Sequence, residues 1–353
     1  MPAAPRPKLE FTTTRQFSSW LSEQNASIFA STYQTGILFM MGLQPNGTMS
    51  YFTRAIARCM GLSVTERTLW VGSMFQLHRF ENIVRPGERH QDFDAYFVPR
   101  VSHTTGDVDI HDVNVDASGK PVFVNTLYSC LATVDERYSF RPLWKPPFIS
   151  RLAAEDRCHL NGLAMVDGEA SYVTCISRSD AASGWRDFRD AGGMVLHVPS
   201  GEVVCSGLSM PHSPRWHNGR LWVHNSGSGH FGYVDFDKGR FEPIAFCPGY
   251  LRGMSFIRDY AIVGVSVGRE STFGGLSLQD NLEKKGVMAR CAIQVVSLKS
   301  GDIAHEIRFT GDIRELFDVA IVPGIRMPGA VGFLSDEIWR RIDIESDTIG
   351  EPV

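Results

Sequence analysis

The sequence lacks the short motifs that assign a reaction directly. Its GxSxG match, GVSVG at residues 264–268, stands in an apolar strand-like run and forms no strand-to-helix elbow, and there is no HExxH, no P-loop and no GxGxxG that follows a strand and opens a helix. The serine-hydrolase elbow, the common zinc-protease helix and the phosphate-binding glycine loops are therefore without support. Function must be inferred from how residues recur along the chain.

Long apolar runs and one-sided charge are also missing. The N-terminus, MPAAPRPKLEFTTTR, has no apolar core of the kind that a secretory signal needs, and no later run reaches about 18 apolar residues. A formal net charge of -4, with acids and bases evenly spread, offers no basic stripe for a phosphate backbone. We expect a soluble cytoplasmic protein that binds neither membranes nor nucleic acid.

Cysteine is present without a pairing pattern. The seven cysteines are an odd number, have no CxxC spacing and mostly stand in apolar, strand-like contexts. We expect buried free thiols rather than disulfides or a zinc knot.

Helical periodicity is scarce, and strands dominate the pattern. The best helix candidate is TRQFSSWLSEQN, residues 14–25, whereas short runs of Val, Ile, Phe, Tyr and Trp between Gly, Asn, Asp and Pro recur throughout. They form a repeating unit of an apolar strand, a turn and a second strand. We call the first residue of each copy its leading residue; these are Met60, His111, Asn161, His212, Arg252 and Phe317.

The spacing of these copies, about 40 to 65 residues, is typical of β-propeller blades with insertions in loops. The fold class predicted is all-β, a six-bladed β-propeller. The alternative is a β-sandwich followed by a second β domain.

The two ends of the repeat complement each other. The last copy, FDVAIVPG, has no clear remainder, whereas SIFASTY, ILFMMGL and MSYFTRAI near the N-terminus have no strand of the first type before them. We expect N- and C-terminal strands to share one blade and close the ring. The predicted organisation is a tail and short helix at 1–26, a propeller at 27–340 and a tail at 341–353.

Two insertions follow second strands, at residues 178–193 and 268–290. Because they occupy the same place in their copies, they should lie on one face of the ring. They serve either as a lid over the channel mouth or in packing and oligomer contact.

The leading residues should converge on the central channel, because the innermost strand of each blade lines it. Two histidines, one asparagine and one arginine would then form a polar cluster on the axis. Each also has a simpler interpretation: a histidine can hydrogen-bond a neighbouring blade, Asn161-Gly162 can be a turn, and Arg252 can pair with a structural acid.

A resemblance sharpens this picture. HLNGLAMVDGEASYV resembles a blade signature of the gluconolactonase, regucalcin and strictosidine synthase group of six-bladed propellers, and HDVNVDASGK and HSPRWHNGRLWV are similar to neighbouring blades. The resemblance implies an axial divalent cation, with Asn161 as a ligand, His111 in place of a second asparagine and His212 in place of an aspartate. The glutamate position corresponds to Met60. The whole chain resembles an uncharacterised bacterial family of propeller-like proteins described as a domain of unknown function.

Imidazoles in place of oxygen ligands change the metal that is expected. Oxygen-only sites favour calcium or magnesium, whereas imidazoles favour zinc, manganese or iron. We therefore predict a divalent metal held by His111, Asn161 and His212. Such an ion can polarise a carbonyl or activate water.

The predicted function is a metal-dependent hydrolase or lyase that acts on a small-molecule or peptide-like substrate. Arg252 would fix an anionic group of the substrate. Asp112 or His159 would act as the base, and either could complete the ligand set; Asp112 could also orient an imidazole or cap a turn.

Two other functions stay open. A non-catalytic binding or scaffold propeller would keep its axial histidines hydrogen-bonded. A metal-free enzyme of the strictosidine synthase kind would need an acidic residue, and no leading residue is a glutamate.

Overall fold

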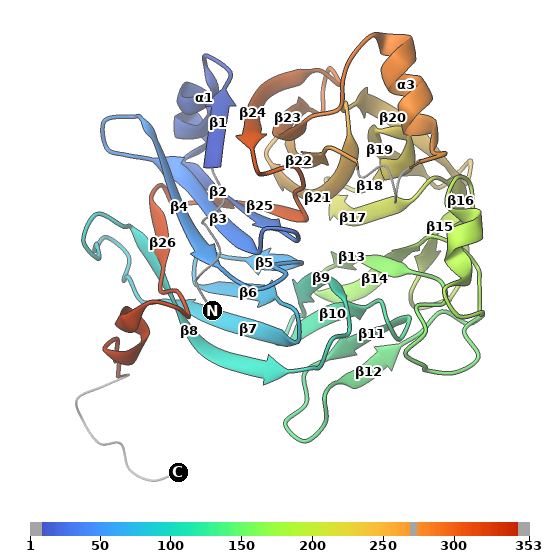
Figure 1. The fold of residues 1–353 in the computed structure, drawn as a ribbon, viewed down its shortest axis with the longest axis horizontal. Coiled ribbons are helices and arrows are strands. Elements are labelled where there is room, and N and C mark those ends of the chain that lie inside the picture. The colour runs from blue at the N-terminus through green and yellow to red at the C-terminus, as the bar shows by residue number, and fades with distance from the viewer. Residues whose placement is uncertain (1–8, 269–273, 345–353) are drawn as a thin grey trace.

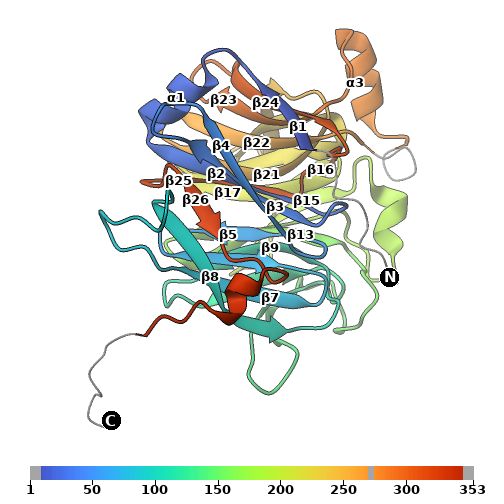
Figure 2. The ribbon, with the colours of Figure 1, turned by 60° about the vertical axis from the view of Figure 1, so that its left-hand side comes forward.

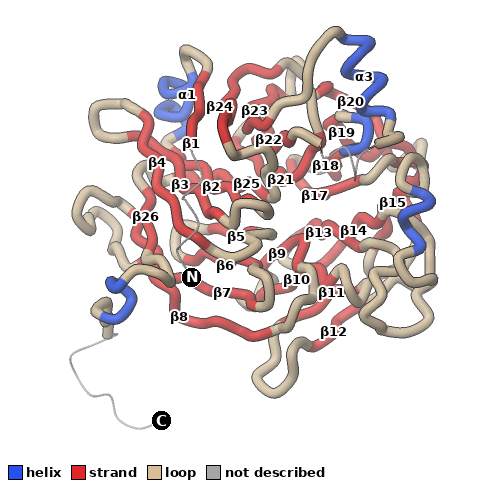
Figure 3. The backbone as a smooth tube through the Cα atoms, viewed as in Figure 1, coloured by secondary structure: helices blue, strands red, loops and turns tan. Residues whose placement is uncertain are grey.

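Six mainly antiparallel sheets surround one axis in the computed structural model (Figures 1 and 3). The structure describes residues 9–268 and 274–344. Four of the sheets have four strands and two have five. The fold is the predicted six-bladed β-propeller, and the prediction of a sandwich with a second β domain is excluded.

One blade, blade 1, is built from both ends of the chain. From the axis outward its strands are β25 (Asp318–Pro323), β2 (Ala26–Thr32), β3 (Ile37–Leu43) and β4 (Met49–Ala55). The late strand β25 pairs antiparallel with the early strand β2 over six residues of each, from Ala26↔Pro323 to Ser31↔Asp318. This pairing closes the ring as the complementary ends of the repeat predict.

The other five blades follow in chain order. Blade 2 contains β5 (Leu62–Val64), β6 (Thr68–Gly72), β7 (Gln76–Asn82), β8 (Ala95–Thr104) and the parallel strand β26 (Pro328–Ala330). Blade 3 contains β9 (Ile110–Val115), β10 (Pro121–Asn125), β11 (Cys130–Thr133) and β12 (Arg141–Trp144). Blade 4 contains β13 (Leu160–Val166), β14 (Glu169–Cys175), β15 (Gly193–His197) and β16 (Val203–Leu208).

Blade 5 contains β17 (Pro211–His217), β18 (Arg220–Asn225), β19 (His230–Asp235) and β20 (Arg240–Phe246). Blade 6 contains β21 (Tyr250–Ile257), β22 (Tyr260–Ser266), β23 (Cys291–Ser297), β24 (Ile303–Gly311) and β1 (Leu9–Thr13). Strand β1 lies in the stretch expected to be a tail, and it extends blade 6 by pairing with β24. The N-terminal segment thus adds a further contact between early and late parts of the chain, beside β25 with β2 and β26 with β8.

Helices are few and short. The helix expected at 14–25 is confirmed as α1 (Phe17–Gln24), which buries Phe17 and Leu21 at the edge of the ring (Figure 2). The others are α3 (Ser277–Lys285) and the 3-10 turns η1 (Gly184–Phe188), η2 (Ser226–Ser228) and η3 (Asp336–Trp339). Among the described residues, no helix has the length and apolar character needed to cross a membrane.

The core consists of apolar layers between adjacent blades. Phe29 of blade 1 meets Phe97 of blade 2 edge to face, with ring centroids 5.7 Å apart, and both side chains are fully buried. Such contacts recur around the ring because both faces of each twisted sheet are covered by a neighbour. All seven cysteines are buried and free, as their scattered spacing predicts.

The innermost strands alternate in how they begin. The second residue of the copy is Asp318, Asp112 or Ser213 in blades 1, 3 and 5, and Gly61, Gly162 or Gly253 in blades 2, 4 and 6. Each acidic or hydroxyl side chain accepts a backbone N–H of the next blade: Leu62 to Asp318 at 2.9 Å, Leu163 to Asp112 at 3.0 Å, and Gly253 to Ser213 at 2.9 Å. The starts of the innermost strands therefore repeat every two blades.

In blades 2, 4 and 6 the second residue of the copy must be glycine, because the backbones of two neighbouring innermost strands meet there. A Cβ on Gly61 would lie 2.9 Å from Cα of Asp112, closer than real Cβ contacts come. The innermost strands can thus converge tightly enough to bring their leading residues to one point.

Candidate metal centre

Three histidines from neighbouring blades gather at one mouth of the channel. They are His111 on β9, His159 immediately before β13, and His212 on β17, and all three are buried. One ring nitrogen of each lies within 4.8 Å of the others. The ring centroids of His111 and His159 are 4.9 Å apart, and those of His111 and His212 are 6.3 Å apart. The fold therefore brings the leading residues His111 and His212 close to His159.

The Nδ1 atom of His159 is held by a carboxylate. Asp156 places its two oxygens 3.0 and 3.1 Å from this nitrogen, and one of them also accepts the indole N–H of Trp185 at 2.7 Å. Trp185 stacks on the imidazole with a centroid distance of 4.2 Å. Nδ1 thus donates to Asp156, which leaves the lone pair of Nε2 available.

The other two rings are fixed in the same way by neutral acceptors. Nδ1 of His212 donates to the backbone carbonyl of Met210 at 2.9 Å. Nδ1 of His111 lies 2.8 Å from the hydroxyl of Thr126, which itself donates to the carbonyl of Leu160 at 2.6 Å and so accepts from the ring. Every imidazole of the cluster therefore uses Nδ1 for support and keeps Nε2 as the candidate ligand atom.

The backbone beneath the cluster is unusual. Five non-glycine residues around it adopt positive φ angles between 45° and 55°: Asp109, Asp156, His159, Met210 and Ser213. Most residues avoid this left-handed region, and such conformations concentrate at functional sites. Here they turn the chain into the innermost strands.

Burial keeps the rings of His111 and His212 neutral. It lowers the pKa of His111 to about 4, and it lowers the pKa of His212 well below its usual value, with the charge of Arg252 acting in the same direction. Burial alone would raise the pKa of Asp156, but His159 and the Trp185 hydrogen bond outweigh it and lower that pKa. Near neutral pH His111 and His212 are uncharged beside an ionised Asp156.

Asn161 lies where the sequence predicts, against the histidines. Its Nδ2 is 3.3 Å from Nε2 of His212, and its Oδ1 accepts the hydroxyl of Thr174 at 2.7 Å. The side chain thus presents an amide N–H to the nitrogen that would bind a metal. Its role as a metal ligand stays a prediction.

A small cavity of about 200 Å³ opens above the cluster. Its lining is formed by Tyr33, Asp109, His111, Asp156, His159, Trp185, Arg186, Met210, Arg252, Glu315 and Phe317. Arg252 is therefore at the mouth, as predicted, but Glu315 already lies 3.1 Å from it. Its guanidinium also rests over the ring of Phe317, 5.0 Å from the centroid.

Asp112 turns away from this cavity. It receives both terminal nitrogens of Arg215 at 2.7 and 3.0 Å, and Arg215 also lies 3.9 Å from Asp318. Successive side chains of a strand point to opposite sides, so the residue after His111 faces the inside of the ring. The expectation that Asp112 orients an imidazole or serves as base is not met by this placement.

Sequence reasoning missed several residues of the cavity. Asp109, Met210 and Glu315 each stand two positions before a leading residue, as His159 does before Asn161. The alternation that brings His159 to the axis applies to them equally. Asp156 and Trp185 come from loops, and only the three-residue spacing of Asp156 from His159 signals its role.

The two insertions pack on one side of the histidines. Trp185 from the first and Leu276, Leu278 and Leu282 from the second share an apolar cluster with Met210 and Tyr250. Tyr250 in turn meets His212 edge to face at 5.6 Å. The insertions therefore cover the same face, as predicted; residues 269–273 of the second lie outside the described residues.

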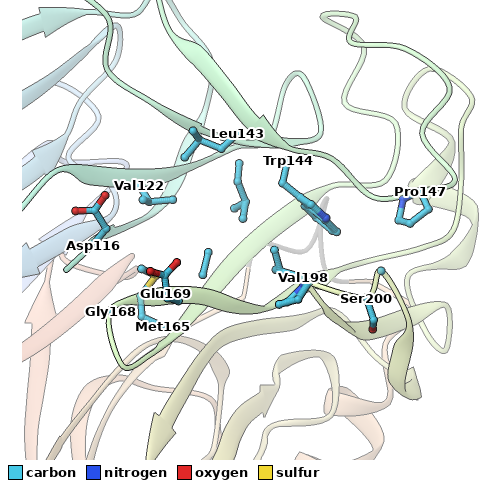
Figure 4. Close-up of a pocket in the computed structure, with 14 residues that line it drawn as sticks. Asp116, Val122, Leu143, Trp144, Pro147, Met165, Gly168, Glu169, Val198 and Ser200 are labelled. Carbon is cyan, nitrogen blue, oxygen red and sulfur yellow. The ribbon is translucent and has the colours of Figure 1, made fainter. Parts of the chain in front are cut away.

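A larger hollow of about 540 Å³ lies between blades 3 and 4 (Figure 4). Leu143, Trp144 and Val198 line it together with the carboxylates of Asp116 and Glu169. Asp116 follows β9, so the hollow is at the opposite end of the innermost strands from His111. Its lining contains no histidine, cysteine, lysine or arginine, and the chemistry-bearing groups gather at the smaller cavity.

Fold and site together define a class: a six-bladed β-propeller with a buried three-histidine cluster at one end of its axis. The chain belongs to the family described as domain of unknown function DUF4915, which matches residues 15–331. A comparison with curated proteins gives no match.

Solved structures share the architecture at low identity. A chain of a nidogen/laminin complex aligns with a TM-score of 0.51 at 12% identity, over 85% of this chain and 98% of that one. Virginiamycin B lyase from Staphylococcus aureus gives 0.38 at 9% identity, over 86% and 99%. A protein of unknown function from Bacteroides caccae gives 0.39 at 7%, over 84% and 98%. These likenesses concern the fold alone.

Proposed function

We propose that the protein is a metal-dependent enzyme, a hydrolase or lyase, whose ion is held by His111, His159 and His212. One observation carries this proposal: three buried imidazoles are each anchored through Nδ1, and one ring nitrogen of each meets the others within 4.8 Å. Anchored histidines of this kind are typical of metal ligands.

The ligand set selects the metal and its chemistry. Three imidazoles favour zinc, manganese or iron over calcium, as the two histidines predicted as ligands from the sequence, His111 and His212, already indicate. A divalent ion with an open position can activate water or polarise a substrate carbonyl. His159 then belongs to the ligands rather than serving as base.

Proton transfer falls to the carboxylates of the cavity. Asp156 orients His159, whereas Asp109 and Glu315 face the cavity while paired with Arg58 at 3.2 Å and Arg252 at 3.1 Å. These two replace Asp112 as candidates for the base. Asn161 would hydrogen-bond beside the ion, or become a ligand by turning its amide over, which exchanges oxygen for nitrogen.

Metal content tests the proposal. After metal-free purification, the protein is incubated with zinc, manganese or iron(II), desalted and subjected to elemental analysis. We expect one equivalent in the wild type and a higher unfolding temperature, since a ligand that binds only the folded state stabilises it.

A double variant, His111→Ala with His212→Ala, should lose both effects. The matched control is His197→Ala with His217→Ala, which removes two histidines outside the cluster. A wild type that takes up no stoichiometric metal and gains no stability would favour the binding or scaffold propeller, whose histidines are only hydrogen-bonded.

A further inference from the structure

Two arginines line the cavity, and their surroundings differ. The Arg252 side chain is 14% exposed and is paired with Glu315 at 3.1 Å. Arg186, on η1 of the first insertion, is exposed, and its guanidinium lies 4.5 Å from the centroid of Trp185. Among the described residues, that guanidinium has no carboxylate partner. Of the two arginines that line the cavity, Arg186 is thus the one whose charge no carboxylate of the described residues neutralises.

The position of Arg186 is tied to the histidines through Trp185. The indole is 3% exposed, stacks on His159 at 4.2 Å and donates its N–H to Asp156 at 2.7 Å. A guanidinium lying over an aromatic ring keeps its N–H edge free for a planar anion. The insertion therefore presents a donor fork beside the candidate metal ligands.

The negative groups of the cavity do not oppose an incoming anion strongly. Asp109 pairs with Arg58 and Glu315 with Arg252, whereas Asp156 accepts hydrogen bonds from His159 and Trp185. Each acid of the lining thus has a partner before Arg186 is counted. A metal ion on the histidines would add further positive charge.

We propose that Arg186, rather than Arg252, binds the carboxylate of a small substrate whose other end reaches His111 and His159 of the histidine cluster. This deepens the proposed function and rests on it. Arg186 and the histidines His111 and His159 line the same small cavity, so one small molecule can reach both. We therefore take small carboxylic acids as the substrate class.

Lactate is a suitable probe, since it carries a carboxylate and a hydroxyl on six heavy atoms. Its binding is followed by ligand-detected NMR at constant ionic strength, first with metal-free protein and then with zinc-loaded protein. Arg186→Gln should weaken lactate binding about tenfold in both forms, and Arg186→Lys less, because an ammonium lacks the bidentate fork. Arg178→Gln, an exposed arginine of the same insertion outside the cavity, should bind within about twofold of the wild type.

The lactate measurement on metal-free protein separates the proposed carboxylate site at Arg186 from the proposed metal site. Loss of lactate binding in Arg186→Gln without metal supports the anion site even if zinc never binds, and normal zinc loading of that variant leaves the metal proposal intact. Equal lactate binding by wild type and Arg186→Gln, or none by wild type in either form, overturns the inference. Inorganic phosphate that binds more tightly than lactate and depends on Arg186 overturns the carboxylate assignment.

Discussion

The propeller axis carries two polar clusters built from adjacent residues of the same strands. On β9, His111 faces the cavity and Asp112 faces the ring interior; on β25, Asp318 enters the interior directly after Phe317 of the cavity wall. In the interior, Arg215 bridges the two carboxylates, which also accept Leu163 and Leu62 amides. In the cavity cluster, each imidazole is anchored through Nδ1, and among the described residues the only hydrogen bond to an Nε2 atom of these rings is the long one from Asn161 to His212, at 3.3 Å.

This difference distinguishes buried polar residues that stabilise the fold from polar residues that can bind a ligand. A buried polar group must find partners within the fold, and the interior cluster finds all of them in the protein. The histidine cluster instead gathers one nitrogen of each ring within 4.8 Å of the others. We infer that the interior cluster holds the blades together and that the cavity cluster holds a ligand.

The largest effect should come from breaking the interior cluster. Arg215→Met would leave Asp112 and Asp318 buried without their cation, and loss of one partner of a buried ion pair costs about 3–5 kcal/mol. Urea unfolding should show this loss, whereas the exposed control Arg137→Met should stay within about 0.5 kcal/mol of wild type. A wild-type unfolding curve for Arg215→Met would refute the structural role.

A pH series sharpens the same point. Burial raises the pKa of Asp318 to about 7, despite the opposing charge of Arg215. A raised folded-state pKa means that the stability it contributes is complete below the unfolded pKa of 3.8 and is lost as pH rises through about 7.

Asp318→Asn does not titrate, so the wild type should lose stability relative to it between about pH 4 and pH 7. The expected difference is on the order of a few kcal/mol, measured by urea unfolding at each pH. The exposed Asp302→Asn should run parallel to wild type. Parallel curves for Asp318→Asn as well would mean that Asp318 is ionised throughout.

In the cavity cluster, the support of His159 can be removed without touching a ligand. Asp156→Asn should lower zinc affinity by about 10- to 100-fold, because the carboxylate fixes the ring and strengthens its donor nitrogen. Competition with a coloured chelator measures this, with Asp187→Asn, an exposed acid of η1, as control. Unchanged affinity would show that Asp156 serves folding alone.

The smallest effect is expected at Asn161. If three histidines hold the ion, Asn161→Ala removes no ligand, only the hydrogen bonds to His212 and Thr174. Zinc affinity should then change by about tenfold or less, because the one bond that reaches a ligand has a net value of about 0.5–1.5 kcal/mol. The same chelator assay applies. A loss of a hundredfold or more would restore Asn161 to the ligand set, as the sequence predicts.

The sequence predicts the ring well because blades repeat. The six leading residues reveal the innermost strands, and the incomplete last copy reveals the closure of β25 on β2. The same repeat brings His111, Asn161 and His212 together, since equivalent positions of neighbouring blades must meet on the axis.

The features that the sequence did not reveal depend on which way a side chain points from its strand and on contacts made by loops. Asp112 was misplaced because one step along a strand reverses the side a residue faces, and the register of β9 decides that step. Asp156 and Trp185 reach His159 through turns with no repeating pattern. Arg215 belongs to no leading position, so nothing in the repeat pairs it with Asp112.

Closure by β25 also sets an order of events as the chain is made. Strands β2, β3 and β4 are synthesised early, yet β2 pairs on its inner side only with β25, whose residues follow nearly 300 positions later. Until then β2, buried at all seven positions in the folded ring, presents an open apolar edge, which is prone to pair with other chains. Assembly of the propeller is therefore most exposed to aggregation just before its last blade is completed.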